Sequence, residues 1–308
     1  MKTKPLGNTG LEPTVLGLGC MSLGTDRKHA ENLIAAALEE GINYFDTADL
    51  YDYGVNEEIV GQALAGSRDR VIIATKAGNR WNSKKDGWHW DPSKSYIKSA
   101  VKESLRRLKT DYIDIYQLHG GTIDDPIDET IEAFEELKDE GLIRQYGISS
   151  IRPNVIREYA DRSNIKTVMM QYSLLDRRPE EEILPYLHDK GIGVMVRGPL
   201  AKGLLSDRTF ENLDGGSLEE NYLDYTNAEL KELLSSIRSR LLNKDRVLTD
   251  ISMQFVLSNP AVQTICAGAS SVEQIKDNTR AVNSRPLSAE ELAFLQMISK
   301  ASVYAEHR

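Results

Sequence analysis

The amino-acid sequence predicts an α/β protein folded as a (β/α)8 TIM barrel, and three observations lead to this fold class. Short β-rich runs alternate with amphipathic helical segments eight times along the chain. Several helical segments end in a charged residue followed by glycine, as at 40–41, 140–141 and 190–191, which is common where a helix turns back into a strand. The 308 residues, 40% of them apolar and 28% charged, suffice for one large core. We therefore expect a single domain over residues 1–308.

Eight runs fit the pattern of a buried strand, rich in apolar and β-branched residues and bounded by turn residues. In chain order they are 15–19, 44–47, 71–76, 112–119, 143–148, 167–171, 192–196 and 262–266. Parallel strands joined by right-handed helical crossovers commonly close into a barrel. A doubly wound open sheet is the alternative, but such a sheet rarely needs eight near-equal units.

The segments between these runs carry apolar residues at spacings of three and four, which is typical of helices packed on a sheet. The clearest stripe comprises Ile97, Ala100, Val101, Ser104, Leu105 and Leu108, preceded by a helix-start signal at 91–95. Other helices are expected at about 30–40, 56–65, 127–140, 153–160, 180–190 and 272–279. Outside the repeat, residues 4–13 predict an N-terminal hairpin plug. Residues 227–242, 248–257 and the capping box at 288–291 predict extra helices toward the C-terminus.

Composition excludes several classes of function. The chain has 38 basic and 47 acidic residues, a net charge of −9, which argues against nucleic-acid binding. No apolar run approaches the ~20 residues that span a bilayer, and the first residues lack the apolar stretch of a signal peptide. We expect a cytoplasmic protein without a membrane partner. Cys20 and Cys266 lie in apolar segments without zinc or redox spacing, so we expect reduced structural thiols and no metal.

In a barrel of this class, chemistry lies at the C-terminal ends of the strands. Those ends carry Asp46 with Tyr51 just beyond it, Lys76, His119, Ser149 and Gln171. A buried Lys76 beside Asp46 would satisfy both charges, and its ammonium would make a nearby Tyr51 phenol easier to ionise. Tyr51 would then be a usable acid, and His119 could orient a carbonyl oxygen or share its proton.

Each of these residues also has an ordinary structural interpretation. Asp46 could cap a turn, Tyr51 could pack in a loop, and His119 could be a hydrogen-bonded core histidine. Lys76 could instead be the Schiff-base lysine of an aldolase-type barrel. That alternative needs an unpaired, neutral lysine, whereas Asp46 should keep Lys76 charged.

Four segments resemble the signature motifs of the aldo-keto reductase family. They are Asn-Tyr-Phe-Asp-Thr-Ala-Asp-Leu-Tyr at 43–51, Thr-Lys-Ala-Gly at 75–78, Tyr-Ile-Asp-Ile-Tyr-Gln-Leu-His at 112–119 and Gly-Ile-Ser at 147–149. The resemblance runs in the correct order from the first strand to beyond Asn278. It implies hydride transfer between a nicotinamide dinucleotide and a carbonyl or alcohol without a metal, the cofactor lying extended over the barrel mouth. It also implies that Asp46, Tyr51, Lys76 and His119 form the catalytic tetrad.

The same resemblance implies cofactor contacts around the mouth. They fall on Gly19, Cys20, Met21, Asp46, Ser149, Ser150, Gln171, Arg197, Gly198, Pro199, Leu200, Lys202, Gly203, Gly268, Ser270, Gln274 and Asn278. The glycines after the seventh strand would let backbone amides approach a pyrophosphate, and Lys202 could add charge.

Three features depart from the family's pattern. Arg197 stands where many members stack an aromatic ring on the nicotinamide; its guanidinium can also stack, but it would disfavour the cationic oxidised ring. Ser150, a shorter donor, stands where Asn is frequent. Gly268, Ser270 and Gln274 stand where members often place a basic residue on the adenosine 2′-phosphate. We expect NADP(H) as the cofactor, with NAD(H) as an open alternative.

Long loops after the third, fourth and seventh strands are expected to wall the substrate pocket. The first holds all three tryptophans and supplies the candidate pocket residues Trp81, Trp88 and His89; the other two span 120–125 and 205–225. The leading hypothesis is an NAD(P)H-dependent reductase of small aldehydes or ketones. The alternative is a nucleotide-sensing regulatory barrel with little turnover, as in the family's potassium-channel beta subunits. The physiological carbonyl, the reaction direction and the oligomeric state stay open.

Overall fold

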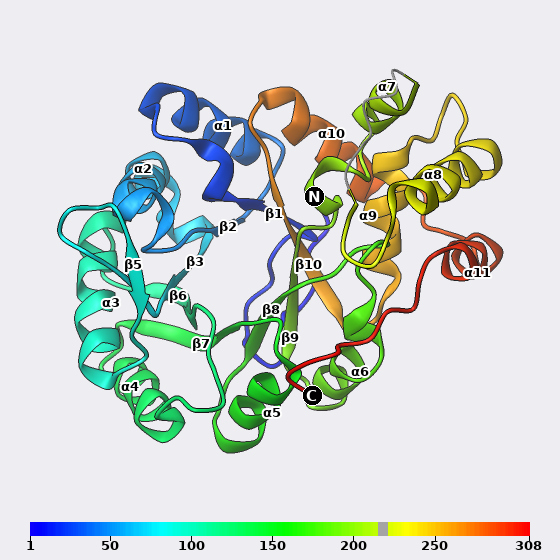
Figure 1. Cartoon of the computed structure of the whole chain (residues 1–308). Helices are drawn as coiled ribbons and strands as arrows, with labels where there is room; N and C mark the ends of the chain where they lie inside the picture. The colour runs from blue at the N-terminus through cyan, green and yellow to red at the C-terminus, as the bar shows by residue number, and fades with distance from the viewer. Residues whose placement is uncertain (215–220) are drawn as a thin grey trace.

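The computed structural model of the chain describes residues 1–214 and 221–308. Its centre is a closed barrel of parallel strands in the order β1-β10-β9-β8-β7-β6-β3-β2, with helices around the outside (Figure 1). Closure of the barrel pairs β1 with both β2 and β10. The predicted (β/α)8 barrel is therefore confirmed, and the open doubly wound sheet is excluded.

The barrel strands coincide with the predicted runs, and no end differs by more than two residues. They are β1 (Leu16–Gly19), β2 (Tyr44–Asp46), β3 (Ile72–Ala77), β6 (Ile113–Leu118), β7 (Ile143–Ser149), β8 (Thr167–Gln171), β9 (Gly193–Arg197) and β10 (Val262–Gly268). Most strand residues are buried on both faces, which explains why the runs show no apolar-polar alternation.

The helices follow the predicted stripes, with one addition. They are α1 (Arg27–Glu39), α2 (Val55–Leu64), α3 (Lys94–Leu108), α4 (Ile127–Asp139), α5 (Pro153–Arg162), α6 (Ile183–Asp189), α7 (Arg208–Asp214), α8 (Asn227–Leu241), α9 (Leu248–Ser258), α10 (Val272–Asn283) and α11 (Ala289–Ile298). Only α7 had no counterpart in the sequence prediction. Within the described ranges, no helix is long and apolar enough to cross a membrane.

Local signals explain where these helices begin and end. Ser93 caps α3 by accepting a hydrogen bond from the backbone N–H of Tyr96, and Ser288 and Glu291 form the predicted capping box of α11. Gly41 and Gly141, which follow α1 and α4, adopt φ of 78° and 73°. Glycine reaches this left-handed conformation without the steric cost of a Cβ atom, so the chain can turn there into the next strand.

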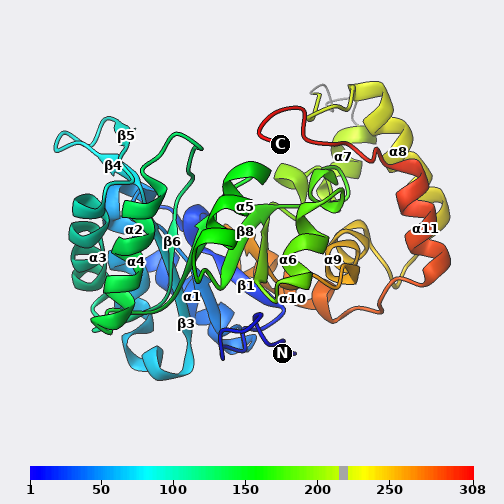
Figure 2. The ribbon, with the colours of Figure 1, turned by 90° about the horizontal axis from the view of Figure 1, so that it is seen from below.

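The N-terminal residues form the predicted hairpin plug. Lys4 N–H donates to the Pro13 carbonyl at 3.1 Å, and Leu6 N–H donates to the Leu11 carbonyl at 2.9 Å. The Leu6 side chain is fully buried among the inner-barrel residues Tyr44, Ile72, Ala74, Ile115, Met169, Met195 and Cys266. The plug closes the end of the barrel opposite the mouth (Figure 2).

The tryptophan-rich segment after β3 is a hairpin, where the sequence predicted a loop. β4 (Asn79–Trp81) pairs antiparallel with β5 (Trp88–Trp90), and the hairpin projects from the barrel beside α2 and α3 (Figure 2). The Trp90 ring lies against Gly78, where a Cβ atom would fall 2.6 Å from it. Its indole N–H donates to Asp125 at 2.9 Å. Trp90 therefore anchors the hairpin to the rim of the barrel.

Candidate active site

The ends of β2, β3 and β6 bring Asp46, Lys76 and His119 together at the barrel mouth, and Tyr51 follows in the short helix η2 (Tyr51–Gly54). Lys76 Nζ lies 2.5 Å from Asp46 Oδ1 and donates to the Thr47 carbonyl oxygen at 2.7 Å. The Lys76 and Asp46 side chains are only 1% and 6% exposed. Two acceptors thus hold the buried amino group in one place.

Lys76 is charged in this environment. Burial alone would disfavour the ammonium, but the paired Asp46 carboxylate outweighs it and raises the pKa of Lys76 above its ordinary value. An amine nucleophile has to be neutral, so the pairing with Asp46 argues against the aldolase alternative.

Tyr51 lies between Lys76 and His119. Lys76 Nζ is 5.2 Å from the centroid of the Tyr51 ring, and the ring centroids of Tyr51 and His119 are 5.9 Å apart at an interplanar angle of 83°. Burial raises the pKa of Tyr51, and Lys76 only partly offsets this. Lys76 lowers the pKa of Tyr51 as predicted, but the net shift is upward because desolvation is the larger effect. The phenol is protonated at neutral pH, the form required of an acid.

His119 is neutral at physiological pH. Burial, together with the charges of Lys76 and Arg197, lowers the pKa of His119 to about 3. Its Nδ1 atom is buried without a hydrogen-bond partner in the described part of the chain, and so is Asp46 Oδ2. Buried polar atoms rarely stay unpaired, so these atoms mark the mouth as a place for polar ligand atoms.

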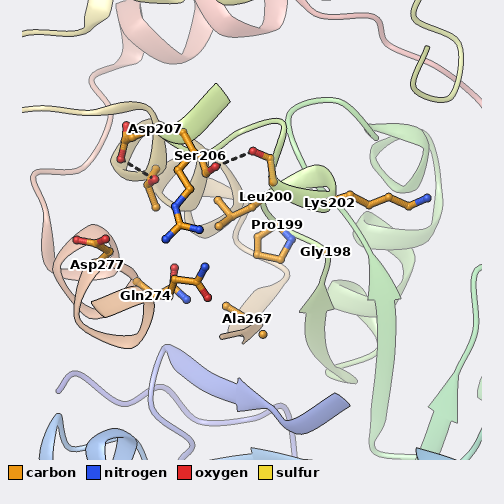
Figure 3. Close-up of a pocket in the computed structure, with 14 residues that line it drawn as sticks. Gly198, Pro199, Leu200, Lys202, Ser206, Asp207, Ala267, Gln274 and Asp277 are labelled. Carbon is orange, nitrogen blue, oxygen red and sulfur yellow. Dashed lines mark hydrogen bonds between the residues drawn. The ribbon is translucent and has the colours of Figure 1, made fainter. Parts of the chain in front are cut away.

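A cavity of about 310 Å³ extends from the end of β9 to α10 (Figure 3). Its lining includes these residues predicted to contact the cofactor: Gly198, Pro199, Leu200, Lys202, Gly203, Gly268, Gln274 and Asn278. Gly198 and Gly203 have φ of 68° and 95°, so the loop after β9 depends on glycine for its path. Gly198, Gly203 and Gly268 leave part of the cavity bordered by backbone that carries no side chain, and this fits the phosphate-bearing part of a dinucleotide.

The cavity also contains a cation that the sequence analysis did not assign. Arg208, at the start of α7, lines it together with Ser206, Asp207, Thr249, Ala267 and Asp277. Lys202, predicted to add charge, points its ammonium away from the cavity (Figure 3). Residues 205–225 were predicted to form part of the wall of the substrate pocket. Of these, 206–208 line this cavity, and 215–220 lie outside the described residues. Arg208 could have been found from the sequence as a basic residue that follows shortly after the glycine-containing loop at 198–203.

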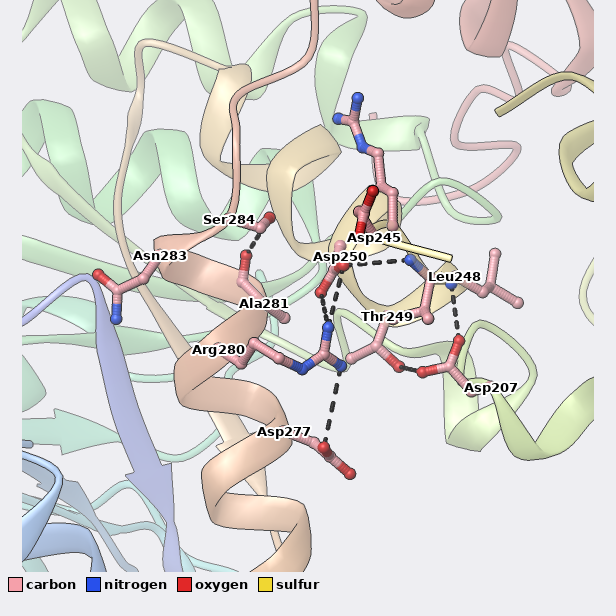
Figure 4. A network of polar contacts seen from close by, with 12 residues as sticks. Asp207, Asp245, Leu248, Thr249, Asp250, Asp277, Arg280, Ala281, Asn283 and Ser284 are labelled. Atoms are coloured by element: carbon pink, nitrogen blue, oxygen red, sulfur yellow. Dashed lines mark hydrogen bonds and ion pairs between the residues drawn. The ribbon is translucent and has the colours of Figure 1, made fainter. Parts of the chain in front are cut away.

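The backbone next to Arg208 is held in place through Asp207. The Asp207 carboxylate accepts from the Leu248 N–H at 2.7 Å and from the Thr249 hydroxyl at 2.9 Å, which ties this segment to the start of α9 (Figure 4). Arg280, a cation on α10, contacts both carboxylate oxygens of Asp250 at 2.8 and 3.0 Å. Arg280 is therefore occupied, whereas Arg208 forms no ion pair within the described ranges.

Of the remaining contacts predicted for the adenosine end of the cofactor, one lines the cavity and one does not. Gln274 lines the cavity, but Ser270 does not. Ser270 instead donates to Gln274 Oε1 from its backbone N–H at 2.7 Å and from its hydroxyl at 3.2 Å. α10 begins at Val272 as predicted, with Ser271 as its N-cap.

The other end of the mouth carries Gln171 and Arg197, which are register partners on β8 and β9. Arg197 Nη1 donates to Gln171 Oε1 at 3.0 Å. Ser149 and Ser150 are buried at the end of β7, and the Ser150 hydroxyl accepts from the Arg152 N–H at 3.2 Å. Ser150 is thus engaged in its own turn. After β1, Gly19 is half-buried, Cys20 is a buried free thiol, and Met21 is 68% exposed.

The three predicted pocket residues lie in the β4–β5 hairpin. Trp81 packs edge-on to Tyr53, with ring centroids 6.1 Å apart, close to the turn that holds Tyr51. Trp88 is 56% exposed. His89 is also exposed, and its partner across the hairpin is Arg80. Trp81 therefore contacts the turn that holds Tyr51.

Comparison with known proteins identifies the class. The model of the aldo/keto reductase family matches residues 15–300. The uncharacterized oxidoreductase YqkF of Bacillus subtilis is 53% identical over 308 residues, which is 100% of both chains. The NADH-specific methylglyoxal reductase of Escherichia coli is 31% identical, with 92% of this chain and 94% of that protein covered. The holo form of aldo-keto reductase AKR11C1 from Bacillus halodurans has 57% identity and a TM-score of 0.94, over 100% and 99% of the chains.

The chain belongs to the aldo-keto reductase family. It is accordingly an NAD(P)H-dependent oxidoreductase with the barrel of that family.

Proposed function

We propose that this chain reduces small aldehydes or ketones with NADPH and that Tyr51 protonates the carbonyl oxygen. The observation that carries the proposal is the buried Lys76 ammonium, which is paired with Asp46 at 2.5 Å and lies 5.2 Å from the centroid of the Tyr51 ring. A positive charge held beside a protonated phenol favours proton loss only once a proton acceptor arrives.

The roles of the four side chains follow from their protonation states. When bound, the nicotinamide dinucleotide supplies the hydride. The Tyr51 hydroxyl donates a hydrogen bond to the substrate oxygen and passes its proton as that oxygen gains charge. Lys76 stabilises the phenolate that remains, and Asp46 keeps Lys76 charged and fixed. His119, neutral at pH 7, orients the same oxygen through a ring nitrogen.

The phosphate-bearing part of the cofactor would be held by the loop at 198–203 and by Arg208. A guanidinium offers a fork of donors that matches phosphate oxygens. Gly268, Ser270 and Gln274 offer no positive charge to the adenosine 2′-phosphate, and Arg208 would supply it. Since NADH lacks this phosphate, the contact would favour NADPH. Gln274 and the N-terminus of α10 would add neutral donors.

The test is a turnover screen of purified protein with aldehydes, ketones and sugars, each with NADPH and with NADH. Oxidation of NADPH that depends on the carbonyl supports the proposal. Tight NADPH binding without oxidation across the screen would contradict it and favour the nucleotide-sensing barrel. Turnover with NADH alone would leave the Tyr51 chemistry intact but overturn the role given to Arg208.

A further inference from the structure

Gln171, at the end of β8, has a hydrogen-bond partner at each end of its amide group. Its Oε1 accepts from Arg197 Nη1 at 3.0 Å, and its Nε2 donates to Asp176 Oδ2 at 2.8 Å. A side-chain amide is nearly symmetric in shape, so its partners decide which atom faces which way. The Arg197 side chain is exposed, whereas Asp176 is buried. Asp176 is thus the partner that can fix the orientation of the amide.

Asp176 has the chemistry needed to do so. Its side chain is fully buried, and Arg178 contacts both of its oxygens, Nε to Oδ1 at 2.7 Å and Nη2 to Oδ2 at 2.8 Å. A carboxylate paired with a guanidinium in this way only accepts hydrogen bonds. Gln171 must therefore present its NH2 group to Asp176 and its carbonyl oxygen to the barrel mouth.

The position of Asp176 does not depend on Gln171. A tight turn fixes its backbone, in which Asp176 N–H donates to the Ser173 carbonyl at 3.0 Å and Ser173 N–H donates to the Asp176 carbonyl at 3.2 Å. The Arg178 guanidinium in turn lies 5.0 Å from the centroid of the Tyr304 ring, near the C-terminus. Asp176 is therefore fixed independently of Gln171, and its carboxylate determines the orientation of the Gln171 amide.

We propose that Asp176 is a positioning residue: it holds the Gln171 carbonyl oxygen toward the mouth, where it can accept a hydrogen bond from the carboxamide NH2 of the nicotinamide and from Arg197. This inference rests on the proposed function, because it takes the nicotinamide to lie at the ends of β8 and β9. Asp176 would then act on the nicotinamide half of the cofactor. The adenosine half, beside Arg208 and Gln274, would be unaffected.

The experiment compares the binding of NADPH with that of 2′,5′-ADP, which lacks the nicotinamide. In Asp176→Asn the new amide can donate or accept, so Gln171 is no longer held in one orientation. We expect NADPH to bind roughly 3- to 10-fold more weakly, the effect of one hydrogen bond, and 2′,5′-ADP to bind as in wild type. In a Gln171→Leu background, Asp176→Asn should have no further effect on NADPH binding.

Asp114→Asn is the matched control. Like Asp176, Asp114 is a buried carboxylate paired with arginine, in this case with Arg68 at 2.8 Å and Arg144 at 3.1 Å. It differs in its place, because it lies on β6 and contacts the start of β3. Asp114→Asn should lower Tm and leave the affinities for NADPH and 2′,5′-ADP unchanged. If Asp176→Asn does not fold, Arg178→Lys provides the second test. A lysine cannot hold both carboxylate oxygens, so the Asp176 carboxylate can rotate away from Gln171 Nε2 and release the amide, and NADPH binding should weaken in the same selective way.

Three results would overturn the inference. One is an equal loss of affinity for NADPH and 2′,5′-ADP, which would show general damage. Another is unchanged NADPH affinity in folded Asp176→Asn, or in Arg178→Lys where the first variant does not fold. The third is an effect of Asp176→Asn that persists in the Gln171→Leu background. Wild-type protein that binds NADPH without turnover would refute the proposed reaction only, whereas wild-type protein that binds no dinucleotide would refute both.

Discussion

Arg107 Nε lies 2.7 Å from Glu57 Oε2, and this buried ion pair joins α3 to α2 beneath the turn that carries Tyr51. Glu57 is fully buried and also accepts from the Thr75 hydroxyl at 2.6 Å, which connects the pair to β3. Gly54, at the end of that turn, has φ 88°, and a Cβ atom there would lie 2.8 Å from Arg107 Cδ. The position of Tyr51 thus depends on an ion pair that contributes no atom to the mouth.

Replacing Arg107 with Met should therefore destabilise the fold strongly. The change leaves the Glu57 carboxylate buried and unpaired, which typically costs about 3–5 kcal/mol. We expect a reduction of that size in the free energy of unfolding, measured with urea. Arg106→Met is the control on the same helix, because Arg106 pairs on the surface with Glu103 and should contribute less than about 1 kcal/mol. Equal effects of the two variants would contradict this account.

Tyr51→Phe should abolish nearly all carbonyl reduction with little change in cofactor affinity. The ring still packs between Lys76 and His119, but it has no proton to give. General acids commonly contribute about 10²–10⁴-fold in rate, so kcat should fall by that factor. Tyr53→Phe removes a phenol from the same turn and should retain normal kcat. More than about a tenth of wild-type turnover in Tyr51→Phe would mean that another group protonates the substrate.

The stability of the fold should depend on the protonation of Asp49, a buried residue just before Tyr51. Burial and the charge of Glu57 raise the pKa of Asp49 to about 8, although Tyr96, which donates to it at 3.0 Å, and Arg107 act the other way. The folded form therefore binds a proton below about pH 8, whereas in the unfolded chain the carboxyl ionises near its ordinary value of 3.8. Because the folded state binds this proton throughout the window, the contribution of Asp49 to stability falls as the pH rises from about 4 to about 8.

Asp49→Asn, which mimics the protonated carboxyl, should remove this dependence. The difference in unfolding free energy between the variant and wild type should grow with pH, by at most about 1.4 kcal/mol per pH unit, and level off above about pH 8. Urea unfolding at several pH values measures it. Asp52→Asn changes an exposed carboxylate in the same turn and should keep the wild-type profile. A difference between Asp49→Asn and wild type that stays constant over this range would show that Asp49 is ionised in the fold.

The sequence was sufficient to predict the barrel and the four residues at its mouth because both depend on regular features. Strand ends of a closed parallel barrel must meet, so Asp46, Lys76 and His119 follow from the strand pattern. The net direction of the Tyr51 pKa shift did not follow, because it depends on how completely the phenol is buried. Residue types and spacing carry little information about that depth.

Irregular segments account for what the sequence analysis missed. β4 and β5 are three residues each and flank the charged stretch at 84–86, so they give no alternation to detect. Asp176 reaches Gln171 only because the chain turns back on itself at 173–176. Arg208 begins α7 directly after a loop whose path is set by the side-chain contacts of Asp207, and nothing in the local pattern indicates which way that loop runs.

Arg208 gives the sharpest test of cofactor choice. It lines the cavity and forms no ion pair among the described residues, and a 2′-phosphate carries close to two negative charges. A charge-assisted hydrogen bond to a phosphate contributes about 1.5–3 kcal/mol, so Arg208→Met should lower kcat/KM with NADPH by roughly 10- to 150-fold. The NADH value should change less than about 3-fold if the contact is with the 2′-phosphate alone.

Lys202→Met is the matched control for Arg208→Met, because Lys202 belongs to the same cavity wall but points its ammonium away from it (Figure 3). It should leave the ratio of NADPH to NADH efficiency near the wild-type value. Raising the salt concentration should reduce the wild-type preference and have little effect on that of Arg208→Met, since the exposed guanidinium is screened. Equal losses with both cofactors in Arg208→Met would place the guanidinium on the pyrophosphate instead. The 2′-phosphate would then depend on Gln274 and the N-terminus of α10, neutral donors that support a preference for NADPH of only about 5- to 150-fold.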